Sequence, residues 1–207
     1  MGYDKRITEL NKSATLQGNE LFATVQSNET KYTTLSDVKN YVTSSIAGVG
    51  SGFGWARYDD TTYTPSSFLI ISGSTSQILP NNAGYTLDTY QNSSTNFYNS
   101  GTQKIQMENE GDVYSMVIVF QAKAPNANST HMEIALSSTG ITPYDRVSKS
   151  ILFAKGNDIW ENVYESFHFY ADADFVANGN QWTLTADGGD VPIANVIYFI
   201  QKTFSGA

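Results

Sequence analysis

The side chains best suited to do chemistry in this sequence are its clustered carboxylates. Two carboxylates that converge across a cleft could hydrolyse a glycosidic bond, and oxygen-rich loops also suit Ca²⁺. No complete EF-hand pattern is present, so we interpret the clusters as solvated loop charges. We expect no cofactor, and Ca²⁺ is the weaker alternative. The clusters are Asp59 and Asp60, Glu108, Glu110 and Asp112, Asp172 and Asp174, and Asp187 and Asp190.

The chain has two histidines and no cysteine. His168 lies in an apolar run, which predicts a buried structural imidazole, whereas His131 is expected at a loop edge. Neither has a Ser or Asp at a motif spacing, and no Gly-x-Ser-x-Gly elbow occurs. Although catalytic triads assemble in space, we expect no enzyme. A glycan hydrolase that uses Asp172 or Asp190 is the least favoured alternative.

Charge and hydropathy exclude two classes of partner. Twelve basic against 20 acidic residues give a net charge of −8, which opposes binding to nucleic acid or anionic membrane. The longest apolar runs hold about five residues, against about 18 for a membrane span. The start lacks an apolar core of signal-peptide length. We therefore expect a chain made in the cytoplasm that binds no nucleic acid and inserts into no membrane.

A composition shift divides the chain into residues 1–45, a glycine-rich linker at 46–54 and a domain at 55–207. Residues 1–45 carry five basic and five acidic side chains, so the rest holds the whole net charge. Strands are predicted at 20–26 and 30–33, and Ser36 is predicted to cap a helix at about 37–46. So few apolar residues cannot bury much surface alone. The candidate docking contacts are Ile7, Leu10, Leu21, Phe22, Val25, Leu35, Val38 and Tyr41.

The first 45 residues resemble a module of tailed-phage fibre proteins. The similarity lies in the ordered series Ile7-Thr8-Glu9-Leu10, Gly18-Asn19-Glu20-Leu21, Lys31-Tyr32-Thr33 and Leu35-Ser36-Asp37-Val38-Lys39. In those proteins the module sits near the amino end and helps to attach or trimerise the fibre. The resemblance implies attachment to capsid or tail proteins at a virion surface, on either the head or the tail.

The pattern from residue 55 onward is all-β. Short apolar or alternating segments are separated by turn-rich stretches, with no helical period between them, which favours an antiparallel jelly roll or β-sandwich. The fold class is therefore mainly β, preceded by the small α+β segment. The predicted strands are 68–71, 77–79, 84–89, 104–107, 113–122, 131–136, 148–153, 163–170, 181–185 and 191–204.

Three of these strands carry unbroken apolar runs, at 116–120, 167–170 and 196–200. Successive side chains of a strand point to opposite faces, so such runs predict that both faces are covered. With no helix expected in this region, a second subunit is the better explanation. The runs also resemble tumour-necrosis-factor-like and complement-type trimeric jelly rolls, which implies aromatic residues around a threefold axis. The trimer-interface candidates are Phe120, Phe169, Tyr170 and Tyr198.

The sequence thus predicts a structural virion protein: a homotrimeric head or tail fibre, or a capsid decoration protein, with an exposed jelly-roll tip. The alternative is a host-receptor module that binds surface glycans. In that case the tyrosine- and asparagine-rich stretches 58–63 and 90–99 would contact the sugars, because aromatic faces stack on sugar rings.

Overall fold

Antiparallel strands make up almost all of the regular structure in the computed structural model. It describes residues 21–26, 29–34, 36, 53–91, 93–124, 131–140, 144–153 and 158–206. The chain divides into two compact units, Met1–Gly48 and Val49–Ala207. No helix among the described residues has the length and apolar character needed to span a membrane.

The first unit contains the predicted hairpin. Strand β1 (Leu21–Gln26) pairs antiparallel with β2 (Glu29–Thr34), so that Gln26 stands opposite Glu29 next to the turn. The hairpin prediction is confirmed, and Ser36 is helical. The candidates Leu21, Phe22 and Val25 lie on β1. The expected helix at 37–46 and the candidates Ile7, Leu10, Leu35, Val38 and Tyr41 lie outside the described residues.

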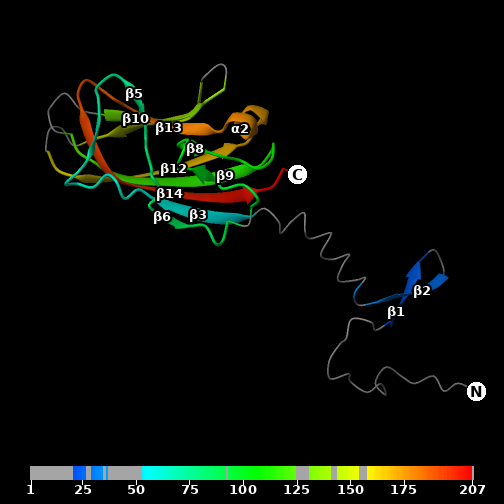
Figure 1. Ribbon diagram of the computed structural model, residues 1–207. Helices are drawn as coiled ribbons and strands as arrows, with labels where there is room; N and C mark the ends of the chain where they lie inside the picture. The colour runs from blue at the N-terminus through cyan, green and yellow to red at the C-terminus, as the bar shows by residue number, and fades with distance from the viewer. Residues whose placement is uncertain are drawn as a thin grey trace, which may run out of the picture. The chain divides into compact units, whose positions relative to one another are not determined.

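The second unit consists of two six-stranded sheets that lie face to face (Figure 1). Sheet I has the order β12 (Glu161–Tyr170), β9 (Val113–Ala122), β14 (Val191–Phe204), β3 (Gly54–Asp59), β6 (Tyr85–Leu87), and β4 (Leu69–Ile71) also pairs with β14. Sheet II has the order β11 (Asp145–Leu152), β10 (His131–Ser138), β13 (Asn180–Ala186), β8 (Lys104–Ile105), β7 (Tyr98–Asn99), and β5 (Ser76–Ile78) also pairs with β13.

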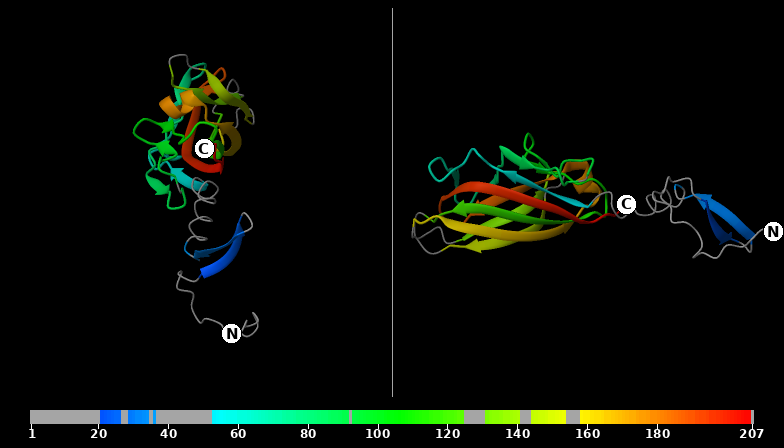
Figure 2. Two further views of the ribbon diagram at one scale, coloured as in Figure 1. Left: turned by 90° about the vertical axis from the view of Figure 1, so that its right-hand side faces the viewer. Right: turned by 90° about the horizontal axis from the view of Figure 1, so that it is seen from below.

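The order of the strands is that of a jelly roll. Every connection from β8 to β14 passes from one sheet to the other, except the hairpin between β10 and β11. This alternation wraps the two sheets around a common core, and all strand pairs are antiparallel. The predicted fold class is therefore confirmed. Figure 2 shows the long strands of sheet I running side by side along the sandwich.

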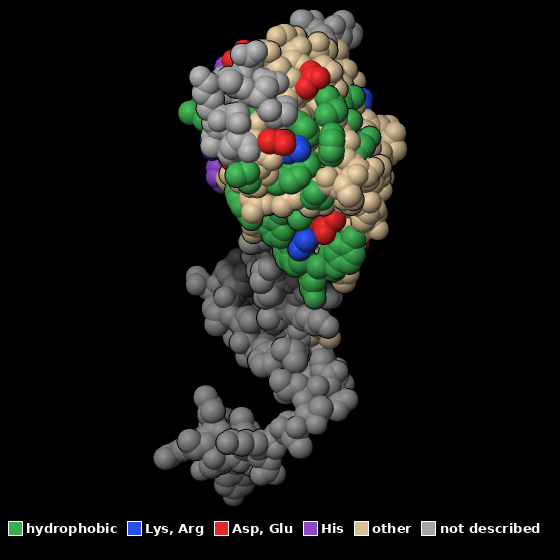
Figure 3. Space-filling model, turned by 90° about the vertical axis from the view of Figure 1, so that its left-hand side faces the viewer, with side chains coloured by type: hydrophobic (Ala, Val, Ile, Leu, Met, Phe, Trp, Pro, Cys, Tyr) green, Lys and Arg blue, Asp and Glu red, His purple; other side chains and the backbone are tan. Residues whose placement is uncertain are grey.

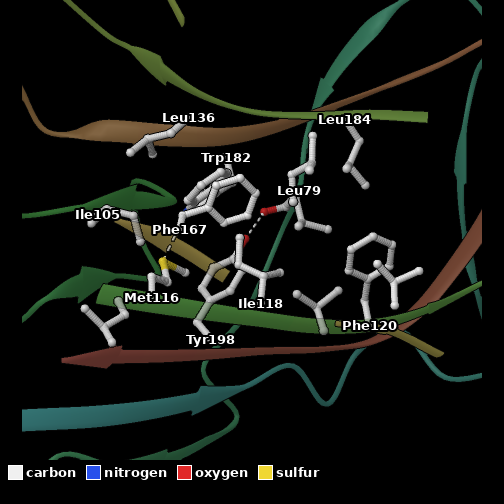
Figure 4. Packing of buried hydrophobic residues seen from close by; sticks show 14 of the residues in the cluster. Leu79, Ile105, Met116, Ile118, Phe120, Leu136, Phe167, Trp182, Leu184 and Tyr198 are labelled. Atoms are coloured by element: carbon white, nitrogen blue, oxygen red, sulfur yellow. Dashed lines mark hydrogen bonds between the residues drawn. The ribbon is translucent and has the colours of Figure 1, made fainter. Parts of the chain in front are cut away.

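The core fills the space between the sheets with large side chains from alternate strand positions (Figure 4). On β9 buried and half-buried residues alternate along the whole strand. Two hydrogen bonds tie polar atoms into this core: the indole Nε1 of Trp182 donates to Sδ of Met116 at 3.1 Å, and the hydroxyl of Tyr198 donates to the carbonyl of Leu79 at 2.7 Å. Burial of these polar atoms is thus compensated.

Three elements of the second unit are absent from the sequence prediction, and the two-residue strand β7 is the shortest of them. A short helix, α2 (Ala173–Asn178), follows β12 and is capped by Asp172, whose Oδ1 accepts from the backbone N–H of Phe175 at 2.8 Å. Strand β3 begins at Gly54, the last residue of the predicted linker. A Cβ at Gly54 would lie 2.0 Å from the carbonyl oxygen of Gln91. This glycine therefore allows close packing of two chain segments.

Candidate functional site

The outer face of sheet I is apolar at its centre. Across the sheet, Val119 stands between Tyr164 and Ile197, and Val117 stands beside Phe199. These positions alternate with buried ones, so their side chains point away from the core. We call the following set the apolar face: Val117, Val119, Tyr164, Ile197, Phe199, Trp55, Leu87, Tyr85 and Tyr90.

Three rings of the apolar face form a continuous stack. Trp55 stacks on Phe199 with 5.3 Å between ring centroids and on Tyr90 with 5.1 Å. The backbone fixes this geometry, because the N–H of Trp55 donates to the carbonyl of Tyr90 at 3.0 Å. Tyr90 is 57% exposed. The stack therefore offers a rigid aromatic surface to whatever contacts this face.

Arg57 and Asp59 lie beside Phe199 and Ile197 of the apolar face and form an ion pair without net charge. Arg57 donates from Nε to Oδ1 of Asp59 at 2.7 Å and from Nη2 to Oδ2 at 2.8 Å. The hydrogen bond to Asp59 raises the pKa of Arg57 above its usual value. Polar side chains bound the face at one end, where the amides of Asn162, Gln121 and Asn195 are linked by hydrogen bonds of 3.1 and 2.7 Å.

A second group of hydrophobic side chains lies at one end of the sandwich. Figure 3 views the end away from the C-terminus and shows hydrophobic side chains gathered there, with acidic and basic side chains among them. The rings of Phe68 and Trp160 lie 5.9 Å apart at their centroids. Nζ of Lys123 lies 5.7 and 5.4 Å from these two centroids and 2.9 Å from Oδ1 of Asp158. Cation–π contact and an ion pair thus hold this lysine in place.

The outer face of sheet II is polar. Glu133 stands opposite Ser150 and Thr185, and Thr185 stands opposite Ser76. The next row contains Ser148 and Thr183 on either side of Ala135, and the row after it contains Ser137 and Gln181. Ile78 and Leu152 are exceptions, at 41% and 79% exposure. One sandwich therefore carries two outer faces of opposite character.

Three of the four trimer-interface candidates point into the core. Phe120, Phe169 and Tyr198 are 0%, 6% and 1% exposed, whereas Tyr170 is 63% exposed on β12. The physical reason is strand parity, since an unbroken apolar run contains both inward and outward positions. In the runs on β9 and β14 the outward members are Val117, Val119, Ile197 and Phe199. Sequence reasoning missed the ring stack, because its three rings come from segments far apart in the sequence.

The clustered carboxylates hold the fold together. Asp60 accepts from the backbone N–H groups of Tyr63 at 2.7 Å and Asn82 at 3.0 Å. Asp112 and Lys202 form a fully buried ion pair of 2.7 Å. Asp112 also accepts from the N–H of Gly206 at 3.0 Å, near the end of the chain. Burial of this pair is compensated because the carboxylate is paired and hydrogen-bonded.

The other carboxylate clusters also form hydrogen bonds or ion pairs within the fold. Ser94 hydrogen-bonds Glu108 and, with Ser93 and Lys202, lowers the pKa of this carboxyl below its usual value. Oδ1 of Asp190 accepts from the N–H of Gly73 at 3.1 Å, and Asp187 lies 3.0 Å from Nδ1 of His131. Among the described residues, no group of three or more His, Asp or Glu side chains could hold a metal ion.

His168 is exposed, so the prediction of a buried structural imidazole is wrong. It lies on β12 between the buried Phe167 and Phe169, on the outward side of the strand. The prediction failed because the apolar neighbours Phe167 and Phe169 point to the opposite face of the strand, into the core. His131 begins β10 and is half-buried.

The proposed sugar-binding stretches 58–63 and 90–99 are in part core. Tyr58 and Tyr98 are 3% and 4% exposed, and their hydroxyls donate to Gln91 Oε1 at 2.8 Å and to the Asn81 carbonyl at 2.6 Å. Burial raises the pKa of Tyr58 to about 12. Of these aromatic residues, Tyr90 is the one with a broadly exposed ring.

Comparison with known proteins places the fold beside other β-rich proteins at low identity. No family model and no curated protein matches the sequence. Similar solved structures include Eiger TNF from S. frugiperda, at TM-score 0.47 and 9% identity over 75% of this chain and 96% of that one. The PRD1 vertex protein matches at 0.42 and 11% over 98% and 90%. Bacillus endospore appendages, described as disulfide-linked pili, match at 0.34 and 10% over 74% and 91%. These similarities are too distant to carry an argument about function.

Proposed function

We propose that the chain is a structural protein of a phage particle whose jelly-roll domain assembles into a homotrimer through the apolar face of sheet I. The first 45 residues, with the β1–β2 hairpin, attach the trimer to capsid or tail proteins. Support for the phage assignment comes from the sequence resemblance of this segment to the fibre module. Support for assembly comes from the jelly-roll domain itself.

The contrast between the two outer faces carries the assembly proposal. Both sheets contribute to one core, and sheet I also places Val117, Val119 and Phe199 on its outside. Contiguous apolar surface of this kind marks sites of protein–protein contact in soluble proteins. Ion pairing of Arg57 with Asp59 removes the net charge that would oppose burial of this face.

The number of copies follows from the resemblance to trimeric jelly rolls. A twofold pair that joins two apolar faces would cover the same residues, because an isologous interface uses one patch twice. Solution mass separates the two arrangements. We expect light scattering of the full chain to give about three times 22.7 kDa.

Matched variants test the face. Val117→Lys places a charge on the apolar face, and Thr185→Lys places the same charge on the outer face of sheet II, next to Glu133. We expect the first variant to be monomeric and the second to keep the mass of the wild-type protein. A wild-type monomer, or equal masses for the two variants, would contradict assembly through sheet I, and a mass of twice 22.7 kDa would contradict the trimer.

A further inference from the structure

A pocket of about 250 Å³ opens where β11 at the edge of sheet II meets β12 at the edge of sheet I. Pockets for drug-sized ligands measure about 300–1,000 Å³, so this one accepts a single ring-sized group. All of its lining comes from one chain. The pocket is therefore complete without a second subunit and does not depend on the proposed trimer.

Two tyrosine rings flank the pocket. Tyr144 is 48% exposed and Tyr170 is 63% exposed, and both contribute to the lining. The ring of Tyr144 is backed by Arg146, whose guanidinium carbon lies 5.0 Å from the ring centroid. These rings offer flat apolar faces to an occupant that has a flat apolar side of its own.

The cation in the lining is already paired. Nη1 of Arg146 lies 2.6 Å from Oδ2 of Asp172, and Nη2 lies 3.0 Å from Oδ2 of Asp174. Its side chain is only 8% exposed. Asp145, another lining residue, adds a negative charge. The pocket therefore has no positive charge to offer an anionic ligand such as a phosphate or a sialic acid.

Hydrogen-bonding groups complete the lining. Within the described part of the chain, the side chains of His168 and Tyr170 form no hydrogen bond. Asp145 accepts from Ser137 Oγ at 2.6 Å through Oδ1, which leaves Oδ2 as an acceptor. An occupant thus meets aromatic faces together with groups that both donate and accept hydrogen bonds.

We propose that this pocket binds one neutral saccharide unit of a glycan. A sugar ring combines an apolar C–H face, which packs on tyrosine, with several hydroxyl groups, which hydrogen-bond to His168, Asp145 and the hydroxyl of Tyr170. A lysine side chain of a partner protein would also suit tyrosine faces. An ammonium group only donates hydrogen bonds, whereas sugar hydroxyls also accept from the donors of His168 and Tyr170, so the sugar fits the lining better.

Saturation-transfer NMR on the full chain tests the assignment. The probes are glucose, galactose, mannose and N-acetylglucosamine, with sialic acid as the anionic comparison and N-acetyl-lysine amide as the cationic one. We expect signal from at least one neutral sugar and none from sialic acid. Tyr170→Ala should weaken binding of that sugar about three- to tenfold, the range for loss of one aromatic contact, whereas Tyr170→Phe, which keeps the ring and removes only the hydroxyl, should weaken it less.

Tyr164→Ala is the matched control, because Tyr164 is 66% exposed on the same side of the same strand and lies outside the pocket. It should bind the sugar like the wild-type chain. The assignment is overturned by no signal from any neutral sugar, by signal from the lysine or sialic acid probe alone, or by equal losses in the Tyr170→Ala and Tyr164→Ala variants. Light scattering of the same samples reports the oligomer separately, so either proposal can fail alone.

Discussion

The two outer faces of the sandwich differ although the two sheets share one core. Sheet I turns valine, isoleucine and aromatic side chains outward, and sheet II turns serine, threonine, glutamine and glutamate outward. The inward positions of both sheets are equally apolar. Because folding needs only the inward positions, the outward difference reflects what each face meets after folding. This comparison carries the proposed assembly, and three predictions test it.

The largest effect should separate folding from assembly on a single strand. Ile118→Ala removes a fully buried side chain of β9 and should lower the free energy of unfolding by about 3 kcal/mol at every protein concentration. Val117→Ala, one residue away on the apolar face, should have little effect in dilute protein and a larger one where the oligomer forms. Urea unfolding at several concentrations measures both. If both variants lowered the free energy of unfolding equally at all protein concentrations, Val117 would stabilise the fold of the single chain and not the oligomer.

A smaller effect concerns the ion pair that joins the two sheets. Hydrogen bonding to Arg146 on β11 lowers the pKa of Asp172, which follows β12. Since the folded pKa lies below the unfolded value of about 3.9, this stabilisation is present above pH 4 and is lost as the pH falls through the folded pKa. Asp172→Asn keeps a helix-capping side chain and should lower the unfolding free energy by about 1–2 kcal/mol at pH 7.

The difference in stability between this variant and the wild type should be smaller at pH 3 than at pH 7. Glu133→Gln on the outer face of sheet II is the control, because Glu133 has no ion pair among the described residues, and it should change little at either pH. Chemical denaturation at the two pH values gives the answer. If the difference between wild type and Asp172→Asn persists in acid, the charge of Asp172 is not the source of its contribution.

The smallest effect belongs to the ion pair on the apolar face. The Arg57 side chain is 43% exposed, so Asp59→Asn should lower the stability of the dilute protein by less than about 1 kcal/mol. Assembly would remove this pair from water and enlarge the effect, since breaking a buried pair leaves an unpaired charge. Thermal unfolding at low and high protein concentration compares the two states. The same small shift in both would place the pair in solvent and argue against coverage of this part of sheet I.

Much of the fold could be predicted because its longest strands have the strongest signal. The bounds of β9 and β14 agree with the predicted 113–122 and 191–204. Strand β3 was missed because it begins at a glycine of the predicted linker and ends at Asp59, which with Asp60 was interpreted as solvated loop charge. Helix α2 was missed because six residues are too few to show a helical period. Only the close approach of Gly54 to Gln91 in space explains the glycine.

The candidate site was predictable in kind but not in its residues. Unbroken apolar runs correctly indicated that sheet I has apolar side chains on both faces. Such a run does not show which of its residues point outward, however. Tyr198 was therefore chosen as an interface candidate, although Phe199 is the outward residue. The pairing of β9 with β14 shows which residues share a face, because it aligns Val117 with Phe199 and Met116 with Ile200. That register depends on partners far apart in the chain.

The pairing of β3 with β14 also determines how the domain responds to a mechanical load. Gly54, where β3 begins, stands opposite Lys202, and the two strands run antiparallel over six register pairs. Consider a pull on Gly54 along the axis of β3 while the rest of the domain is held in place. The hydrogen bonds to β14 are then strained together in shear, and they cannot open one after another as in a zipper. The strand through which tension enters the domain is therefore the one whose attachment has to fail all at once.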